Sequence, residues 1–248
     1  MKLNKNALIP YFTFGDPDLE TTKKLILESA KAGADCIELG LPFSDPIADG
    51  PVIQASHQRV LEKYPTLSID TALAMVNDCK NYVVVPIIFM ASSNLILNYG
   101  IASFFKNAKA NKLDGIIIPD LPIEEADAYR IHAKQNSIAL IFLLSPLTTG
   151  KRMTQIIKAT EGFLYLISTT GTTGERQSLS QDLEQTVKAI KKTRNIPVIV
   201  GFGISQPEQY SDVCAYADGV IVGSHLVKMM GDVSAISSRI GVFKSALK

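Results

Sequence analysis

Two acidic side chains, eleven positions apart, have the types and surroundings that acid–base chemistry requires. Glu38 lies within the apolar run CIELG, where a charged residue is uncommon unless it has a partner or a task. If Glu38 points into a cavity, loss of water raises its pKa and prepares it to exchange a proton near neutral pH. A salt bridge to a Lys or Arg across the sheet is the alternative role.

The loop LPFSDPIADGP follows Glu38 and contains the second acid. Asp45 and Asp49 occupy the turn contexts SDP and ADGP, in which an aspartate usually bonds its own backbone. That turn role remains open for both residues. Prolines stiffen the loop, however, so an aspartate held there after Glu38 is a plausible partner in an acid–base pair.

Three glycine-bearing segments could bind an anion: 171–174 (GTTG), 201–205 (GFGIS) and 223–224 (GS). Each is compatible with ordinary turns, since glycine adopts positive φ without strain. Loops after the last two strands of a β/α barrel, beside a helix N-terminus, often hold a phosphate through backbone amides. No Lys or Arg lies within these motifs, so we expect amides to meet most of the charge.

The elements that must position these residues follow a repeating pattern of apolar runs and helical stretches. Runs that are apolar at nearly every position are typical of parallel strands covered on both faces. The eight runs are Ala7–Phe14, Cys36–Leu41, Val83–Met90, Gly115–Ile118, Ala139–Leu144, Phe163–Ile167, Pro197–Gly201 and Gly219–Gly223. The helical candidates between them include Leu19–Ala32, Ile101–Ala110, Glu124–Lys134, Arg152–Thr160, Leu183–Lys192 and Pro207–Ala215.

Eight strand–helix units predict an α/β fold, a (β/α)8 TIM barrel, with residues 1–248 forming a single domain. An open doubly wound sheet is the alternative, but no GxGxxG motif follows the first run. In a barrel, the chemistry is carried by loops at the carboxyl ends of the strands. Glu38, Asp49 and the glycine segments all fall at such ends.

Composition excludes several classes of partner. With 25 basic and 24 acidic residues the formal charge is +1, which argues against nucleic acid or an acidic membrane. Cys36, Cys79 and Cys214 form no CxxC pair, as expected in a reducing compartment. The N-terminus lacks the apolar stretch of a signal peptide, and the longest apolar run, Val83–Ala91, contains a proline. We expect a cytoplasmic protein.

Other chemistry-bearing residues give weaker signals. His57, His132 and His225 show no metal-ligand spacing, so no metal site is expected. Tyr11 and Tyr165, with Phe202, are aromatic residues at strand ends. Such residues more often pack than line a ligand, unless the ligand is itself aromatic.

Several motifs carry a family resemblance. The string ELGLPFSDPIADGPVIQAS resembles the signature of the tryptophan synthase α chain family. Matches to YFTFGDP, PDLPIEE, TTGTTG, GFGIS and VGS run in order from Tyr11 to Ser224, nearly the whole chain. The first string is long and specific, whereas GFGIS alone is weak evidence.

The resemblance implies a carbon–carbon lyase of tryptophan biosynthesis, which cleaves indole-3-glycerol phosphate to indole and glyceraldehyde 3-phosphate. It makes Glu38 the acid that protonates C3 of the indole ring and assists removal of the glycerol hydroxyl proton. It makes Asp49 the residue that hydrogen-bonds the ring N–H and stabilises the positive charge. The C–C bond then breaks in a retro-aldol sense.

The same resemblance assigns the substrate contacts. It places the indole pocket at Tyr11, Ile117, Leu143, Tyr165 and Phe202, with Tyr165 also hydrogen-bonding near Glu38. It places the phosphate at Gly174, Gly203, Gly223 and Ser224, and makes Thr173 a further substrate contact. It implies no metal or organic cofactor in this chain.

A partner is also implied. Family members associate with a pyridoxal-phosphate (PLP) β chain, usually as an α2β2 heterotetramer, and pass indole to it through a tunnel. The loop Pro42–Pro51 and the segment from Thr169 to about Leu179 correspond to the family's mobile elements. Pro42 and Asp45 are the expected contacts with the β chain.

Two departures from the family pattern leave other functions open. Ser92 replaces a tyrosine common in relatives, and Ser168-Thr169-Thr170-Gly171 replaces Ser-Arg-x-Gly. Loss of an aromatic wall and a loop cation would lower affinity or weaken loop closure. The alternatives are an α-like chain that activates a β chain without cleaving substrate, and another phosphate-binding barrel, such as a sugar-phosphate isomerase or thiamin-phosphate synthase.

Overall fold

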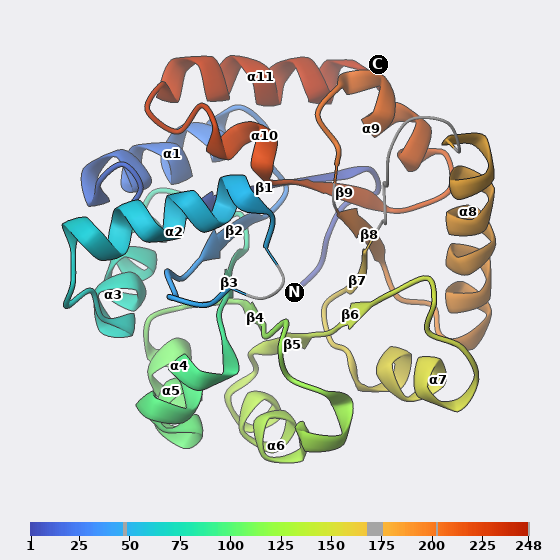
Figure 1. Ribbon diagram of the computed structural model, residues 1–248, viewed down its shortest axis with the longest axis horizontal. Coiled ribbons are helices and arrows are strands. Elements are labelled where there is room, and N and C mark those ends of the chain that lie inside the picture. Colours follow the sequence, from blue (N-terminus) through green and yellow to red (C-terminus); the bar gives the residue numbers. More distant parts are fainter. Residues whose placement is uncertain (47–48, 168–175, 202, 248) are drawn as a thin grey trace.

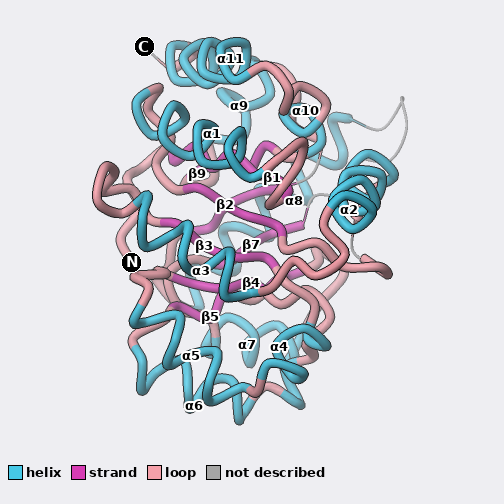
Figure 2. The backbone as a smooth tube through the Cα atoms, turned by 90° about the vertical axis from the view of Figure 1, so that its left-hand side faces the viewer, coloured by secondary structure: helices cyan, strands magenta, loops and turns pink. Residues whose placement is uncertain are grey.

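A computed structural model describes residues 1–46, 49–167, 176–201 and 203–247, with the backbone alone for 176–181. Parallel strands surround a common axis and helices form an outer ring (Figure 1). Seen from the side, the strands lie between helices above and below them (Figure 2). The predicted α/β barrel is therefore confirmed.

All neighbouring strands pair in parallel, in the order β5-β4-β3-β2-β1-β9-β8-β7-β6. The strands are β1 (Ala7–Thr13), β2 (Ile37–Gly40), β3 (Ile87–Met90), β4 (Gly115–Ile117), β5 (Ala139–Ile141), β6 (Leu143–Leu144), β7 (Leu164–Ile167), β8 (Val198–Gly201) and β9 (Gly219–Val222). Nearly every strand residue is buried, as the uninterrupted apolar runs predict.

The fifth predicted run is divided in the structure. β5 pairs with β4 and β6 pairs with β7, and only Phe142 separates them in the chain. The break has a local cause, because the Phe142 amide donates to the Thr160 hydroxyl at 3.0 Å and not to a neighbouring strand. The eight runs thus form eight barrel strands, the fifth in two parts.

The six named helical candidates are all helical; Ile101–Ala110 keeps both of its expected bounds, and the other five are shifted at one or both ends. They correspond to α1 (Leu19–Lys31), α5 (Ile101–Ala110), α6 (Asp127–Asn136), α7 (Gly150–Ala159), α8 (Arg176–Thr193) and α9 (Pro207–Cys214). The start expected at Glu124 is wrong, because residues Ile123–Glu125 form a separate 3-10 turn, η1, ahead of α6. The run from Val83 also becomes strand only at Ile87, after the fully exposed Val84.

Five further helices were not among the candidates: α2 (Pro51–Lys63), α3 (Ile69–Cys79), α4 (Ser93–Tyr99), α10 (Ser224–Val227) and α11 (Val233–Ser245). The helix that matters most for the site is α2. Pro51 stands in its first turn, where a missing N–H costs nothing, and Ile53 and Val60 are buried at helical spacing. Within the described residues, no helix is both long and apolar enough to cross a bilayer.

Barrel closure depends on a glycine between the first and last strands. A Cβ at Gly219 would lie 2.3 Å from the Ala7 carbonyl oxygen, a distance that only backbone movement can relieve. We expect Gly219→Ala to lower the free energy of unfolding by about 2–3 kcal/mol, the range of an overpacked core. Urea denaturation measures the change.

Gly241→Ala in α11 is the matched control, since its Cβ would meet no atom within 4 Å. We expect this change to stabilise the protein by roughly 0.5–1 kcal/mol through helix propensity. Equal effects of the two substitutions would contradict the assignment of Gly219 to the closure of the barrel.

Candidate active site

A cavity of about 310 Å³ opens at the carboxyl ends of the strands. Its walls bring together residues far apart in the sequence, including Glu38, Asp49, Tyr165 and Gly223. The carboxylates, the aromatic side chains and the glycine loops predicted from separate motifs therefore share one space.

Glu38 is completely buried in β2, and neither of its carboxylate oxygens has a hydrogen-bond partner. No salt bridge reaches it within the described part of the chain, so the pairing alternative raised by the sequence has no support there. Burial, followed by the negative charge of Asp49, raises the pKa of Glu38 to about 8. The side chain is therefore protonated at neutral pH.

Asp49 lies in the loop that leads from β2 into α2, and its half-buried side chain lines the same cavity. Its backbone shapes the loop: the Asp49 amide donates to the Pro46 carbonyl at 3.2 Å, and its carbonyl accepts from Gln54 at 2.8 Å. Burial raises the pKa of Asp49 to about 6. The pair thus combines a neutral acid with a carboxylate that is mostly ionised at pH 7.

Tyr11, Leu143 and Tyr165 line the cavity as predicted, but Ile117 does not. Ile117 is fully buried in β4, and Met90 of β3, its partner in the strand register, lines the cavity in its place. Neither Glu38 oxygen has a hydrogen-bond partner, so the hydrogen bond expected from Tyr165 near Glu38 does not end on the Glu38 carboxyl group. Burial holds the pKa of the Tyr165 phenol well above its usual range.

Each of the two tyrosines lies over a strand-end glycine. A Cβ on Gly40 would lie 1.9 Å from the Tyr11 hydroxyl oxygen, and one on Gly201 would lie 2.2 Å from that of Tyr165. The aromatic rings occupy the space that a side chain would take. The placement of both rings therefore depends on glycine at the end of a nearby strand.

Gly203, Gly223 and Ser224 lie together at one end of the cavity, as the phosphate prediction requires. Thr173, Gly174 and Phe202 fall outside the described residues, as does the departure at 168–171. Lys228 lines the same cavity, so a cation stands beside the backbone amides that we expect to meet most of the charge of an anion. Sequence motifs missed Lys228 because it stands four residues beyond VGS, and the short helix α10 brings it back.

Arg239 of α11 links two segments that line the cavity. Arg239 donates to His225 Nε2 at 3.0 Å and to the Ser205 carbonyl at 2.7 Å. It thereby joins the loop after β8 to α10. Burial, followed by the positive charges of Arg239 and Lys228, lowers the pKa of His225.

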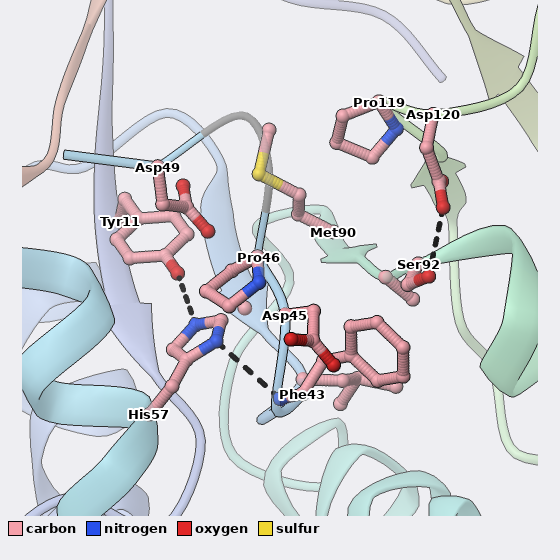
Figure 3. A pocket seen from close by; sticks show the side chains of 13 residues that line it. Tyr11, Phe43, Asp45, Pro46, Asp49, His57, Met90, Ser92, Pro119 and Asp120 are labelled. Atoms are coloured by element: carbon pink, nitrogen blue, oxygen red, sulfur yellow. Dashed lines mark hydrogen bonds between the residues drawn. The ribbon is translucent and has the colours of Figure 1, made fainter.

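A second, smaller hollow adjoins the first and is shown in Figure 3. On its far wall the Ser92 hydroxyl and the Ser93 amide each donate to Asp120 at 2.8 Å. Polar groups from the loops after β3 and β4 thus bond each other at Ser92, where the family resemblance implies a tyrosine. Asp45 is exposed and Pro42 is half-buried on the loop after β2, at the same end of the barrel.

His57 is a second functional candidate, after Lys228, whose role the sequence did not predict. It is 4% exposed in α2 and contacts Tyr11 and Phe43 (Figure 3). Burial lowers its pKa to about 4, so its ring is neutral at pH 7. Its helical spacing from Ile53 and Val60 could have indicated that His57 is buried on the same face of α2. Metal-ligand spacing gives no indication of its role. No group of three potential metal ligands occurs among the described residues.

The raised pKa of Glu38 has a consequence for stability. Between pH 4.5, where an exposed glutamate ionises, and about pH 8, the folded protein keeps a proton that the unfolded chain has lost. Wild-type stability therefore falls as the pH rises through this window. Glu38→Gln removes the titration, so we expect the variant to gain roughly 2–4 kcal/mol relative to wild type between pH 4.5 and 9.

Urea denaturation across this pH range measures the difference in unfolding free energy between the two proteins. Glu62→Gln, an exposed position on α2, is the control and should show no such trend. A difference that stays constant from pH 4.5 to 9 would mean that Glu38 ionises normally in the folded state.

Comparisons with known proteins identify the family of this chain. The family model for the tryptophan synthase alpha chain matches residues 1–243. The tryptophan synthase alpha chain of Geotalea uraniireducens is 43% identical over 249 residues, covering 100% of this chain and 92% of that protein. The one from Arabidopsis thaliana is 42% identical over 229 residues, covering 92% and 82%.

Solved structures give the same result. A structure of the tryptophan synthase α2β2 complex from Pyrococcus furiosus matches with a TM-score of 0.89 and 35% identity, covering 98% of this chain and 99% of that one. The tryptophan synthase subunit alpha of Legionella pneumophila matches with a TM-score of 0.89 and 34% identity, covering 98% and 92%. This chain belongs to the tryptophan synthase alpha chain family.

Proposed function

We propose that this chain cleaves indole-3-glycerol phosphate into indole and glyceraldehyde 3-phosphate, acting as a carbon–carbon lyase. The observation that carries the proposal is a protonated carboxyl group, Glu38, buried without a partner in the same cavity as Asp49 and the glycine loops. An acid held neutral in this way is suited to protonate a weakly basic carbon.

The reaction needs two proton movements and one bond cleavage. Glu38 donates its proton to C3 of the indole ring, which leaves a cation centred on the ring nitrogen. Asp49, as a carboxylate, accepts a hydrogen bond from the ring N–H and stabilises that charge. Glu38, now ionised, takes the proton of the adjacent hydroxyl while the bond between C3 and the hydroxyl-bearing carbon breaks. The bonding electrons return to the ring, and the carbon becomes the aldehyde of glyceraldehyde 3-phosphate.

The far end of the substrate supplies the anchor. The backbone around Gly203 and Gly223, the Ser224 hydroxyl and the Lys228 ammonium lie where a phosphate ester would reach. Binding energy gained there positions the reacting carbon against Glu38 and increases turnover, not only affinity. Tyr11, Leu143 and Tyr165, with Met90, supply the wall for an aromatic ring.

We propose the same assembly as that of the Pyrococcus furiosus relative, an α2β2 complex. Pro42 and Asp45 would contact the β chain, which would receive the indole and carry PLP. We assign no cofactor to this chain and treat residues 1–248 as one cytoplasmic domain.

The test follows indole release from indole-3-glycerol phosphate, with and without a β chain. We expect slow release by the isolated chain and faster release in the complex. Glu38→Gln should abolish release, because the amide cannot supply the proton that C3 needs, while folding and β-chain binding persist. Asp49→Asn should reduce the rate by about three orders of magnitude, the range for losing an electrostatic stabiliser.

Glu62→Gln, on the exposed side of α2, serves as the carboxylate control and should cleave at the wild-type rate. Stimulation of the β chain without any indole release would instead identify a silent activator. Absence of both effects would favour another phosphate-binding barrel enzyme.

The two carboxyl groups also predict a pH dependence. Cleavage requires a protonated Glu38 and an ionised Asp49, whose pKa values are about 8 and about 6. We therefore expect kcat/KM to rise as the pH passes 6 and to fall as it passes 8. Initial rates between pH 5 and 10 test this. A rate that continues to increase above pH 9 would show that Glu38 does not act as the acid.

A further inference from the structure

The ring of His57 joins two parts of the site that are distant in sequence. Its Nε2 atom is 3.2 Å from the Tyr11 hydroxyl oxygen, and its Nδ1 atom is 3.4 Å from the Phe43 backbone nitrogen. All three side chains appear together in Figure 3, with Asp49 beside the Tyr11 ring. His57 is 4% exposed and Tyr11 is 3% exposed, so water competes little for these bonds.

The chemistry of the partners determines the tautomer. A backbone N–H can only donate, so Nδ1 of His57 must be the unprotonated acceptor. In the neutral ring the proton then resides on Nε2, which donates to the Tyr11 oxygen. The Tyr11 hydroxyl is therefore left with its own proton to donate elsewhere.

Tyr11 faces the acid pair. It pairs with Glu38 in the register of β1 and β2, and both side chains line the cavity with Asp49. Burial first, and then the charges of Asp49 and Glu38, raise the pKa of the Tyr11 phenol, and they outweigh the lowering of that pKa by the Thr13 side chain. A phenol that keeps its proton at all working pH values is a fixed hydrogen-bond donor for a neighbouring carboxylate.

A separate set of bonds already holds α2 in place. Asp16, 3% exposed after β1, accepts from Ser56 and from two nitrogens of Arg59, at 3.2 Å for Nε and 2.5 Å for the terminal nitrogen. These bonds attach α2 to the loop after β1 without His57. The histidine therefore does not need to be a structural clamp, and its two bonds lead to Tyr11, which lines the cavity, and to Phe43, which lines the adjoining hollow.

We propose that His57 is a positioning residue of the acid–base site, which holds the Tyr11 hydroxyl so that its proton can be donated to the Glu38 carboxylate once that group has ionised, and which ties that hydroxyl to the loop carrying Asp49. The inference rests on the proposed cleavage reaction. Tyr11 acts on the carboxylate that Glu38 becomes after giving up its proton, and His57 acts only through Tyr11.

Two conservative substitutions separate the two bonds. Gln at position 57 can place an amide N–H where Nε2 was, and Asn can place an oxygen where Nδ1 was. We expect His57→Leu to lower kcat for indole release about tenfold to a hundredfold, with KM changed less than about threefold, because the hydrogen bond matters once charge develops. His57→Gln should recover most of kcat, and His57→Asn should not.

A double-mutant cycle with Tyr11→Phe tests whether His57 acts through the hydroxyl. Tyr11→Phe should lower kcat as much as His57→Leu does, and adding His57→Leu to it should cost less than about twofold more. Multiplicative losses, or equal rescue by Gln and Asn, would overturn the proposal and leave His57 with a packing role. His132→Gln, in α6, is the matched histidine control and should leave kcat unchanged.

A measurement that does not depend on indole release tests the role of His57 separately from the cleavage reaction. Long-range ¹H–¹⁵N spectra of the folded chain should show His57 as the neutral Nε2–H tautomer at pH 7, and should show a changed ring environment in Tyr11→Phe. If wild type releases no indole but the tautomer is as expected, the cleavage reaction is wrong and the hydrogen-bond geometry is right. An Nδ1–H tautomer would refute the positioning role directly.

Discussion

The site depends on one carboxyl group that is buried with nothing to neutralise it. A charge placed in the protein interior without a partner costs several kcal/mol, and a carboxyl group avoids that cost by keeping its proton. Glu38 meets this condition because it lies in β2 with both oxygens unpartnered. The barrel thus makes an acid by withholding solvent and counter-charge. The other groups of the site either exclude water from Glu38 or interact with its carboxyl group.

The barrel surrounds Glu38 with aromatic rings that exclude water, and it holds a second carboxyl group, Asp49, in a fixed position. β1 and β7 contribute Tyr11 and Tyr165, each seated over a glycine, so the rings approach the backbone closely and exclude water. The loop from β2 to α2 holds Asp49 through its backbone, while the ion pair between Arg59 and Asp16 fixes the helix that follows. The strand β2 therefore determines how deeply Glu38 is buried, and the loop from β2 to α2 determines where Asp49 lies.

Much of this arrangement was predictable from sequence, because parallel strands covered on both faces leave an uninterrupted apolar pattern. Glu38 stood out for the same reason, as a charge within such a run. The break at Phe142 was not predictable, because it depends on a hydroxyl from Thr160, eighteen residues away. The roles of Lys228, Met90 and His57 were not predicted for a related reason. Each reaches the cavity or the adjoining hollow through tertiary packing, and no local motif marks that role.

The seating of the two tyrosines over Gly40 and Gly201 constrains the order in which these positions can change over evolutionary time. A larger residue at 40 is excluded while the ring of Tyr11 occupies its space, although a shrunken residue at 11 would permit it. The reverse order passes through a steric clash. Lineages that diverge at the pocket wall must therefore alter the aromatic residue first, and a larger residue at position 40 would record that the ring has already been lost.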